Sequence, residues 1–91
     1  QLFIASLEDV LAQVDDGIGR ADIALLGAMG HRAKSTALNI GAADFGHQCL
    51  LLEQAAAGGD VAATLALAQS LRPMFLPIRA ALMQILQPLP D

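Results

Sequence analysis

The chain has few of the residues that characterise disulfide-rich domains, β-sheets and nucleic-acid-binding surfaces. Its single cysteine, Cys49, cannot form an internal disulfide, so nothing requires an oxidising compartment. Tryptophan and tyrosine are absent, only three phenylalanines occur, and valine, isoleucine and threonine are sparse. Because aromatic and β-branched side chains are the ones that fit a pleated sheet, this composition favours helices. A net charge of −4 argues against a nucleic-acid partner.

The sequence also lacks a run of apolar residues that would be read as a membrane span. Its longest uncharged stretches, such as residues 61–71, are shorter than the roughly 18 to 20 residues needed to cross a bilayer, and they contain polar side chains. No basic segment followed by an apolar stretch and a cleavage site is visible, as an export signal would require. We therefore expect a cytoplasmic module that does not itself insert into a membrane.

Alanine and leucine dominate the 55% apolar content of the 91 residues, which is enough for one domain, residues 1–91, with a single core. Apolar residues recur at spacings of three and four, the pattern of helices with one buried face. In the first segment they are Phe3, Leu7, Val10, Leu11 and Val14. Glycine readily takes the left-handed conformation that ends helices, so we expect this helix to stop at Gly17, with Gly17 and Gly19 marking the turn.

Three further helices are expected, each starting at an aspartate that can accept a hydrogen bond from the first turn: Asp22, Asp44 and Asp60. The second helix is expected to run to about Ile40, and the glycines that end the second and third helices are Gly41, Gly58 and Gly59. The inward positions of the third helix are Phe45, Cys49, Leu52 and Ala56. Those of the fourth are Val61, Leu65, Ala68, Leu71, Phe75, Leu82 and Leu86.

Pro73 and Pro77 fall inside the fourth helical segment. Each proline lacks an N–H and crowds the carbonyl four residues earlier, so we expect this helix to be kinked or split near Pro73. Four helices joined by short turns predict an all-α fold, an antiparallel up-and-down four-helix bundle.

The second helix carries a histidine on the side away from the core. Winding residues 22–40 at about 100° per residue gathers the large apolar residues on one side and places His31 opposite them. The inward residues are Leu26, Met29, Ala33, Ala37 and Ile40. Around His31 lies a strip of mostly small side chains, which consists of Ala24, Gly27, Ala28, Lys34, Ser35 and Leu38. A strip with so few long charged side chains indicates a surface that another protein approaches closely.

Positive charge is concentrated near this histidine, because Arg20, Arg32 and Lys34 are three of the five basic residues in the chain. Lys34, at i+3, lies on the same helix face and can reach phosphoryl oxygens attached to the imidazole. Arg32 lies about 100° round the helix, where it can meet the carboxylates of a partner. An exposed imidazole is largely neutral at pH 7, which leaves one ring nitrogen free to attack phosphorus.

The segment from His31 to Ala42, HRAKSTALNIGA, resembles the signature of the histidine phosphotransfer (HPt) family. In that signature lysine follows the histidine at +3, small residues occupy +4 to +6, and an apolar residue, glycine and alanine end the motif. The following helix resembles the family's Leu, Cys and Leu-Glu positions with Phe45, Cys49, Leu52 and Glu53. The linked motifs cover residues 27–53. The family usually has leucine at +2 and glycine at +4, where this chain has Ala33 and Ser35, so packing behind the histidine and clearance in front of it are expected to differ.

The resemblance implies a phosphorelay intermediate of two-component signalling. His31 would accept a phosphoryl group from the aspartate of a receiver domain and pass it to a response regulator, with Lys34 offsetting the phosphoryl charge. The docking surface for the receiver would consist of Gly27, Ala28, Arg32, Ser35 and Leu38. The receiver would supply Mg²⁺ and an acidic pocket, while this module would bind no cofactor, act as a monomer and have no ATP-dependent kinase activity. The apolar start at Leu2 without a capping residue fits a module of a hybrid sensor kinase, tethered to the inner membrane through its parent, or a trimmed free-standing protein.

Two other functions fit the same residues. One is a helical interaction module that docks a partner through the Gly27, His31 and Leu38 face without phosphotransfer. The weaker one is a carrier of a small apolar ligand, which would need a cavity. The small residues Gly27, Gly30 and Ser35 have two possible explanations, packing inside the bundle and clearance for a partner, and the sequence does not decide between them.

The remaining polar residues point to structure more than to chemistry. His47 and Cys49 are two residues apart and so face different sides of a helix, which argues against a shared zinc ion. Cys49 is interpreted as a buried small hydrophobe and His47 as an exposed or rim residue. Glu53 is interpreted as a structural or solvated acid.

Overall fold

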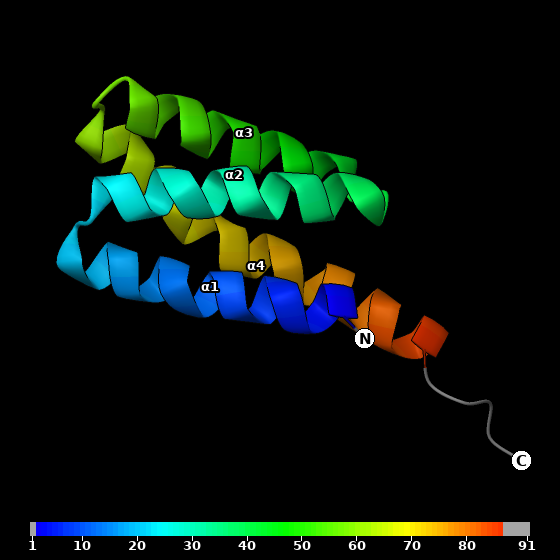
Figure 1. Ribbon diagram of the computed structural model, residues 1–91. Helices are drawn as coiled ribbons and strands as arrows, with labels where there is room; N and C mark the ends of the chain where they lie inside the picture. Colours follow the sequence, from blue (N-terminus) through cyan, green and yellow to red (C-terminus); the bar gives the residue numbers. More distant parts are fainter. Residues whose placement is uncertain (1, 87–91) are drawn as a thin grey trace, which may run out of the picture.

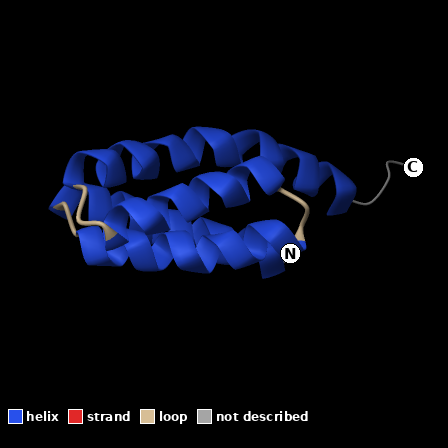
Figure 2. Cartoon of the chain, turned by 90° about the horizontal axis from the view of Figure 1, so that it is seen from above, coloured by secondary structure: helices blue, strands red, loops and turns tan. Residues whose placement is uncertain are grey.

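The structure, a computed structural model, describes residues 2–86, with side chains from Ile4 to Ile85. This part of the chain consists of four helices and contains no strand: α1 (Leu2–Arg20), α2 (Ile23–Asn39), α3 (Ala43–Ala57) and α4 (Val61–Leu86). Each helix packs against its neighbours along the chain, and α1 also packs against α4, which closes the bundle (Figure 1). The connection after α2 lies at the opposite end of the bundle from the connections after α1 and α3 (Figure 2).

The core is built from the inward positions that the helical periodicity predicts. Phe45 of α3 and Phe75 of α4 meet at its centre, with their ring centroids 6.2 Å apart and the rings tilted. The other buried side chains of this cluster include Leu7, Val10, Leu11, Val14, Leu26, Met29, Ala33, Ala37, Cys49, Leu52, Ala68 and Leu71. The prediction for Val61 is wrong, because its side chain is half-exposed at the start of α4. Phe3 and Leu86, also predicted to face inward, have side chains outside the described ones.

The prediction that the first helix stops at Gly17 is wrong, because α1 continues through Gly17 and Gly19 to Arg20. Gly17 is buried, and a Cβ there would lie 2.8 Å from the side chain of Leu26 on α2, so this glycine permits close helix packing. The chain turns instead at Ala21, which has a φ of 50°. The left-handed backbone conformation of an alanine costs on the order of 1 kcal/mol. In the same turn the Asp22 N–H donates a hydrogen bond to the carbonyl oxygen of Gly17, one of the last carbonyls of α1.

Two of the three predicted N-caps are present. Asp22 accepts a hydrogen bond from the Leu25 N–H at 3.1 Å, and Asp60 accepts one from the Ala63 N–H at 3.1 Å. Asp44 is not a cap, because α3 begins one residue earlier and its N-cap is Ala42. Asp44 therefore lies in the first turn of α3, where a carboxylate still interacts favourably with the helix dipole.

The fourth helix is not split at Pro73, since α4 runs unbroken from Val61 to Leu86 with both prolines inside it. Pro73 and Pro77 lie on the exposed side, where water can satisfy the carbonyls that lose their helical partners. Two ion pairs, from Arg72 to Asp15 and from Arg79 to Glu8, each 2.6 Å long, attach this stretch to α1. A kink near Pro73 stays a prediction.

The same helix is long and apolar enough from Val61 to Ile85 to meet the length and composition criteria of a membrane span, which the sequence analysis did not anticipate. Helices in the core of a bundle meet these criteria as well. Here Ala68, Leu71 and Phe75 of α4 are buried against the other helices, so one side of α4 belongs to the core.

Candidate functional site

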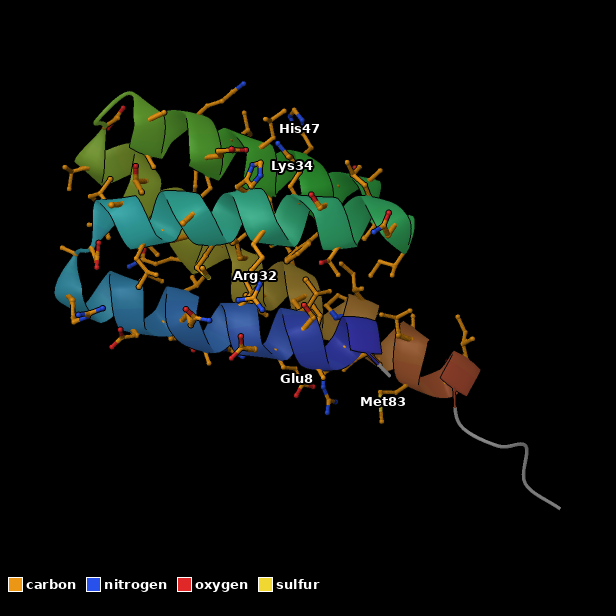
Figure 3. All side chains as sticks on the ribbon, in the orientation of Figure 1. Glu8, Arg32, Lys34, His47 and Met83 are labelled. Atoms are coloured by element: carbon orange, nitrogen blue, oxygen red, sulfur yellow. The ribbon has the colours of Figure 1, made fainter. Side chains whose placement is uncertain are left out.

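His31 lies on α2 with its side chain two-thirds exposed, and it contacts a carboxylate on the neighbouring helix. Its Nδ1 is 2.7 Å from Oε2 of Glu53 on α3. The two residues are 22 positions apart in the sequence, and the packing of α2 against α3 brings them together. The side-chain arrangement along this boundary is visible in Figure 3.

Glu53 also binds Lys34, so one carboxylate joins both residues of the predicted site. The Lys34 ammonium donates a hydrogen bond to Oε1 at 2.9 Å, and Figure 3 places Lys34 on the side of α2 that faces α3. This bond, together with the His31 contact, lowers the pKa of Glu53 below its ordinary value, although partial desolvation opposes the shift. The stabilisation from these contacts is therefore present above the ordinary carboxyl pKa and is lost as pH falls through the lowered one.

The ionised Glu53 determines which nitrogen of His31 carries the proton. A carboxylate only accepts hydrogen bonds, so the 2.7 Å contact requires Nδ1 to be the N–H donor. In the neutral ring the other nitrogen, Nε2, then has the free lone pair. The arrangement therefore provides an exposed imidazole with one defined nucleophilic atom.

The contact between His31 and Glu53 depends on close packing of α2 on α3. A Cβ on the buried Gly30 would lie 2.9 Å from the carbonyl oxygen of Cys49 and 3.3 Å from the backbone nitrogen of Glu53. A Cβ on Gly27 would lie 2.8 Å from Cβ of Ala56. Both glycines thus face α3, and helix packing explains why neither position carries a side chain.

Gly30→Ala is expected to destabilise the bundle although alanine is the better helix former. The methyl group must displace α3 backbone, and overpacking of this kind costs about 1–3 kcal/mol, against a helix-propensity gain of up to about 1 kcal/mol. We expect a net loss on the order of 1 kcal/mol in urea unfolding followed by circular dichroism. Gly19→Ala is the control, because a Cβ there meets nothing within 4 Å. This substitution should therefore increase stability through the higher helix propensity of alanine. An unchanged or more stable Gly30→Ala chain would contradict this account of the packing.

Arg32 lies on the other side of α2, towards α1 (Figure 3). Its Nη2 is 3.4 Å from Oδ2 of Asp9, and both side chains are about half-exposed. The same oxygen of Asp9 accepts a hydrogen bond from Gln13 at 3.1 Å. Arg32 is therefore adjacent to His31 on the helix but already has an acidic neighbour within its own chain.

The predicted docking strip is exposed for most of its length. Ala28 and Ser35 are exposed, and Leu38 keeps 60% of its surface accessible although it is a large apolar residue. Gly27, in contrast, is only partly exposed and faces α3. The exposed surface beside His31 thus includes the small side chains of Ala28 and Ser35 and one large apolar side chain, Leu38.

A metal site or a ligand pocket is not found among the described residues. No group of three histidine, cysteine or acidic side chains among residues 2–86 could hold a metal ion, and no pocket is found there. His47 is exposed on α3, whereas Cys49 is buried, and burial raises the pKa of its thiol to about 12. A thiol with that pKa remains protonated and unreactive near neutral pH.

The cluster in the structure contains two residues that the sequence predicts for the site and one that it does not. His31 and Lys34 lie together on one face of α2, and their chemical roles stay predictions. Glu53, which the sequence predicts to be a structural or solvated acid, contacts both of them, and the sequence does not predict these contacts. The Leu52 and Glu53 pair that matches the family pattern was the available signal.

Comparison with known proteins identifies one family. The family model described as the Hpt domain matches residues 1–87, which is nearly the whole chain. No curated protein and no solved structure matches the chain.

Proposed function

Since this chain belongs to the Hpt domain family, whose members act in the phosphorelays of two-component signalling and interact with receiver domains or response regulators, we propose that His31 is its phosphoacceptor. The observation that supports the proposal most strongly is the hydrogen bond between Nδ1 of His31 and Glu53, because it leaves the lone pair of Nε2 free on a side chain that is two-thirds exposed. In this proposal the four helices form an antiparallel up-and-down scaffold that presents α2 to the receiver.

The proposed step is an exchange of one bond for another. Nε2 of His31 attacks the phosphorus of the receiver's aspartyl phosphate, the P–O bond to the aspartate breaks, and the aspartate leaves as a carboxylate. The proton on Nδ1 stays on the ring, which becomes cationic as Nε2 bonds to phosphorus. Glu53 stabilises that charge through its contact with Nδ1. Transfer to a response regulator is the same step in reverse.

Lys34 is proposed to offset negative charge on the phosphoryl oxygens. Its ammonium has three N–H donors, of which Glu53 takes one in this structure, so further donors remain for a phosphoryl group. The partner receiver is expected to supply Mg²⁺, which stabilises the negative charge on the phosphoryl group during transfer. The side chains around His31 do not fit an Mg²⁺ site in this chain, because Glu53 is already bound to His31 and Lys34.

The proposed partners are one receiver domain as donor and one response regulator as acceptor. Ala28, Arg32, Ser35 and Leu38 would form the docking surface, with Gly27 at its border towards α3. We further propose that the module is a monomer that works in the cytoplasm as part of a hybrid sensor kinase.

The test is phosphoryl labelling. The chain is incubated with purified receiver domains that carry radiolabelled phosphate on their aspartates, and the label on this chain is followed in acid and in alkali. We expect a label that is stable in alkali, labile in acid and located by mass spectrometry on the peptide that contains His31. Absence of a label from every receiver, or an alkali-labile label, would reject the proposal.

A further inference from the structure

Every lysine and arginine of the described chain is paired with a carboxylate of the same chain. The chain contains five such residues, and their nearest carboxylate contacts range from 2.6 to 3.4 Å. A receiver that presents acidic side chains to the His31 face must therefore compete with internal acids. The strength of an internal pair on that face then affects how tightly a partner docks.

Among these pairs, that of Arg32 with Asp9 has the longest contact and lies beside His31. Arg20, Lys34, Arg72 and Arg79 approach a carboxylate to 2.9 Å or less, whereas Arg32 stays 3.4 Å from Asp9. The pair lies at the α1–α2 boundary, Arg32 is next to His31 in the sequence, and both side chains are about half-exposed. Gln13 binds the same oxygen of Asp9 and so holds this carboxylate in place when Arg32 turns away.

We propose that Asp9 on α1 is a specificity-determining residue that competes with an acidic side chain of the receiver for Arg32. The inference rests on the proposed function, since it requires a receiver to dock over His31. Docking exchanges the Arg32–Asp9 pair for a pair between Arg32 and the receiver. Asp9 thereby weakens docking of every receiver that takes Arg32 by the same factor, and it lowers the affinity of those receivers relative to receivers that dock without Arg32. It acts through Arg32 and is a positioning residue that has no contact with the phosphoryl group.

The proposal is tested by transfer kinetics with a purified receiver domain that labels the wild-type chain. Asp9→Asn is expected to lower the KM for the phosphorylated receiver about two- to fivefold, the range that exposed ion pairs span, and to leave the maximal transfer rate unchanged. The advantage should shrink as salt is added, because the freed Arg32 is exposed.

Two further variants separate this mechanism from a general charge effect. Asp15→Asn makes the same charge change on α1 at a residue that pairs with Arg72, and its KM should match the wild type. In an Arg32→Gln background, Asp9→Asn should have no effect. A KM that stays at the wild-type value in Asp9→Asn, an equal effect of Asp15→Asn, or an effect that persists without Arg32 would overturn the inference. If no receiver labels the wild-type chain, the proposed function fails and this inference fails with it, which is a distinct result.

Discussion

His31→Gln is expected to abolish phosphoryl acceptance completely. Glutamine keeps a polar side chain that can still meet Glu53, so the local hydrogen bonding is preserved while the imidazole is lost. An amide has no basic nitrogen lone pair comparable to that of a neutral imidazole and cannot form the N–P bond. Labelling from a phosphorylated receiver should therefore fall below detection.

His47→Gln is the matched control for this experiment, since it removes the other histidine of the chain. His47 is exposed on α3 (Figure 3). None of the side-chain hydrogen bonds and ion pairs among residues 4–85 involves it. Its replacement should leave the rate and extent of labelling unchanged. Label that persists in His31→Gln and disappears in His47→Gln would move the site to α3.

A comparison of His31→Gln with the wild type also separates phosphotransfer from docking alone. If the chain only docks a partner through its smooth α2 face, receiver binding persists in His31→Gln and the wild type takes no label. If it transfers phosphoryl groups, binding persists in the variant and the label is lost. Receiver binding measured by calorimetry, alongside labelling, distinguishes the two functions.

Glu53→Gln is expected to slow phosphoryl transfer on the order of 10- to 100-fold, by analogy with the loss when the carboxylate that orients a metal-binding imidazole is removed. The carboxylate accepts a hydrogen bond from the Nδ1–H group and so keeps Nε2 unprotonated. A glutamine amide can instead donate to Nδ1, which favours the tautomer with the proton on Nε2. The substitution also removes the negative charge that, in the proposed transfer, stabilises the cationic phosphoimidazole.

The tautomer itself is the measurement that separates orientation from a loss of structure. Nitrogen chemical shifts of the His31 ring should show the proton on Nδ1 in the wild type and a shift towards Nε2 in Glu53→Gln. Glu8→Gln is the control, because Glu8 accepts a hydrogen bond from Arg79 at 2.6 Å, a contact between α1 and α4. A Glu53→Gln chain that transfers at the wild-type rate, or whose ring tautomer is unchanged, would show that Glu53 has no such role.

The helix boundaries show where local rules are sufficient. The caps at Asp22 and Asp60 are confirmed because capping depends on atoms only three residues apart. Gly17 was misread as a terminator because its role is to admit the Leu26 side chain of another helix, and no local pattern distinguishes the two uses. Pro73 does not split α4, since the exposed side of the helix tolerates the missing bonds and core contacts continue on the other side.

The site divides in the same way. The sequence by itself determined that His31 faces away from the core and that Lys34 shares its surface, because both follow from the period of one helix. Only the tertiary structure decided that Glu53 binds both of them, that Arg32 pairs with Asp9, and that Gly27 and Gly30 face α3. Those contacts depend on how the helices are rotated and how closely they approach, which is set by the packing of the whole core and not by the spacing of residues along any one helix.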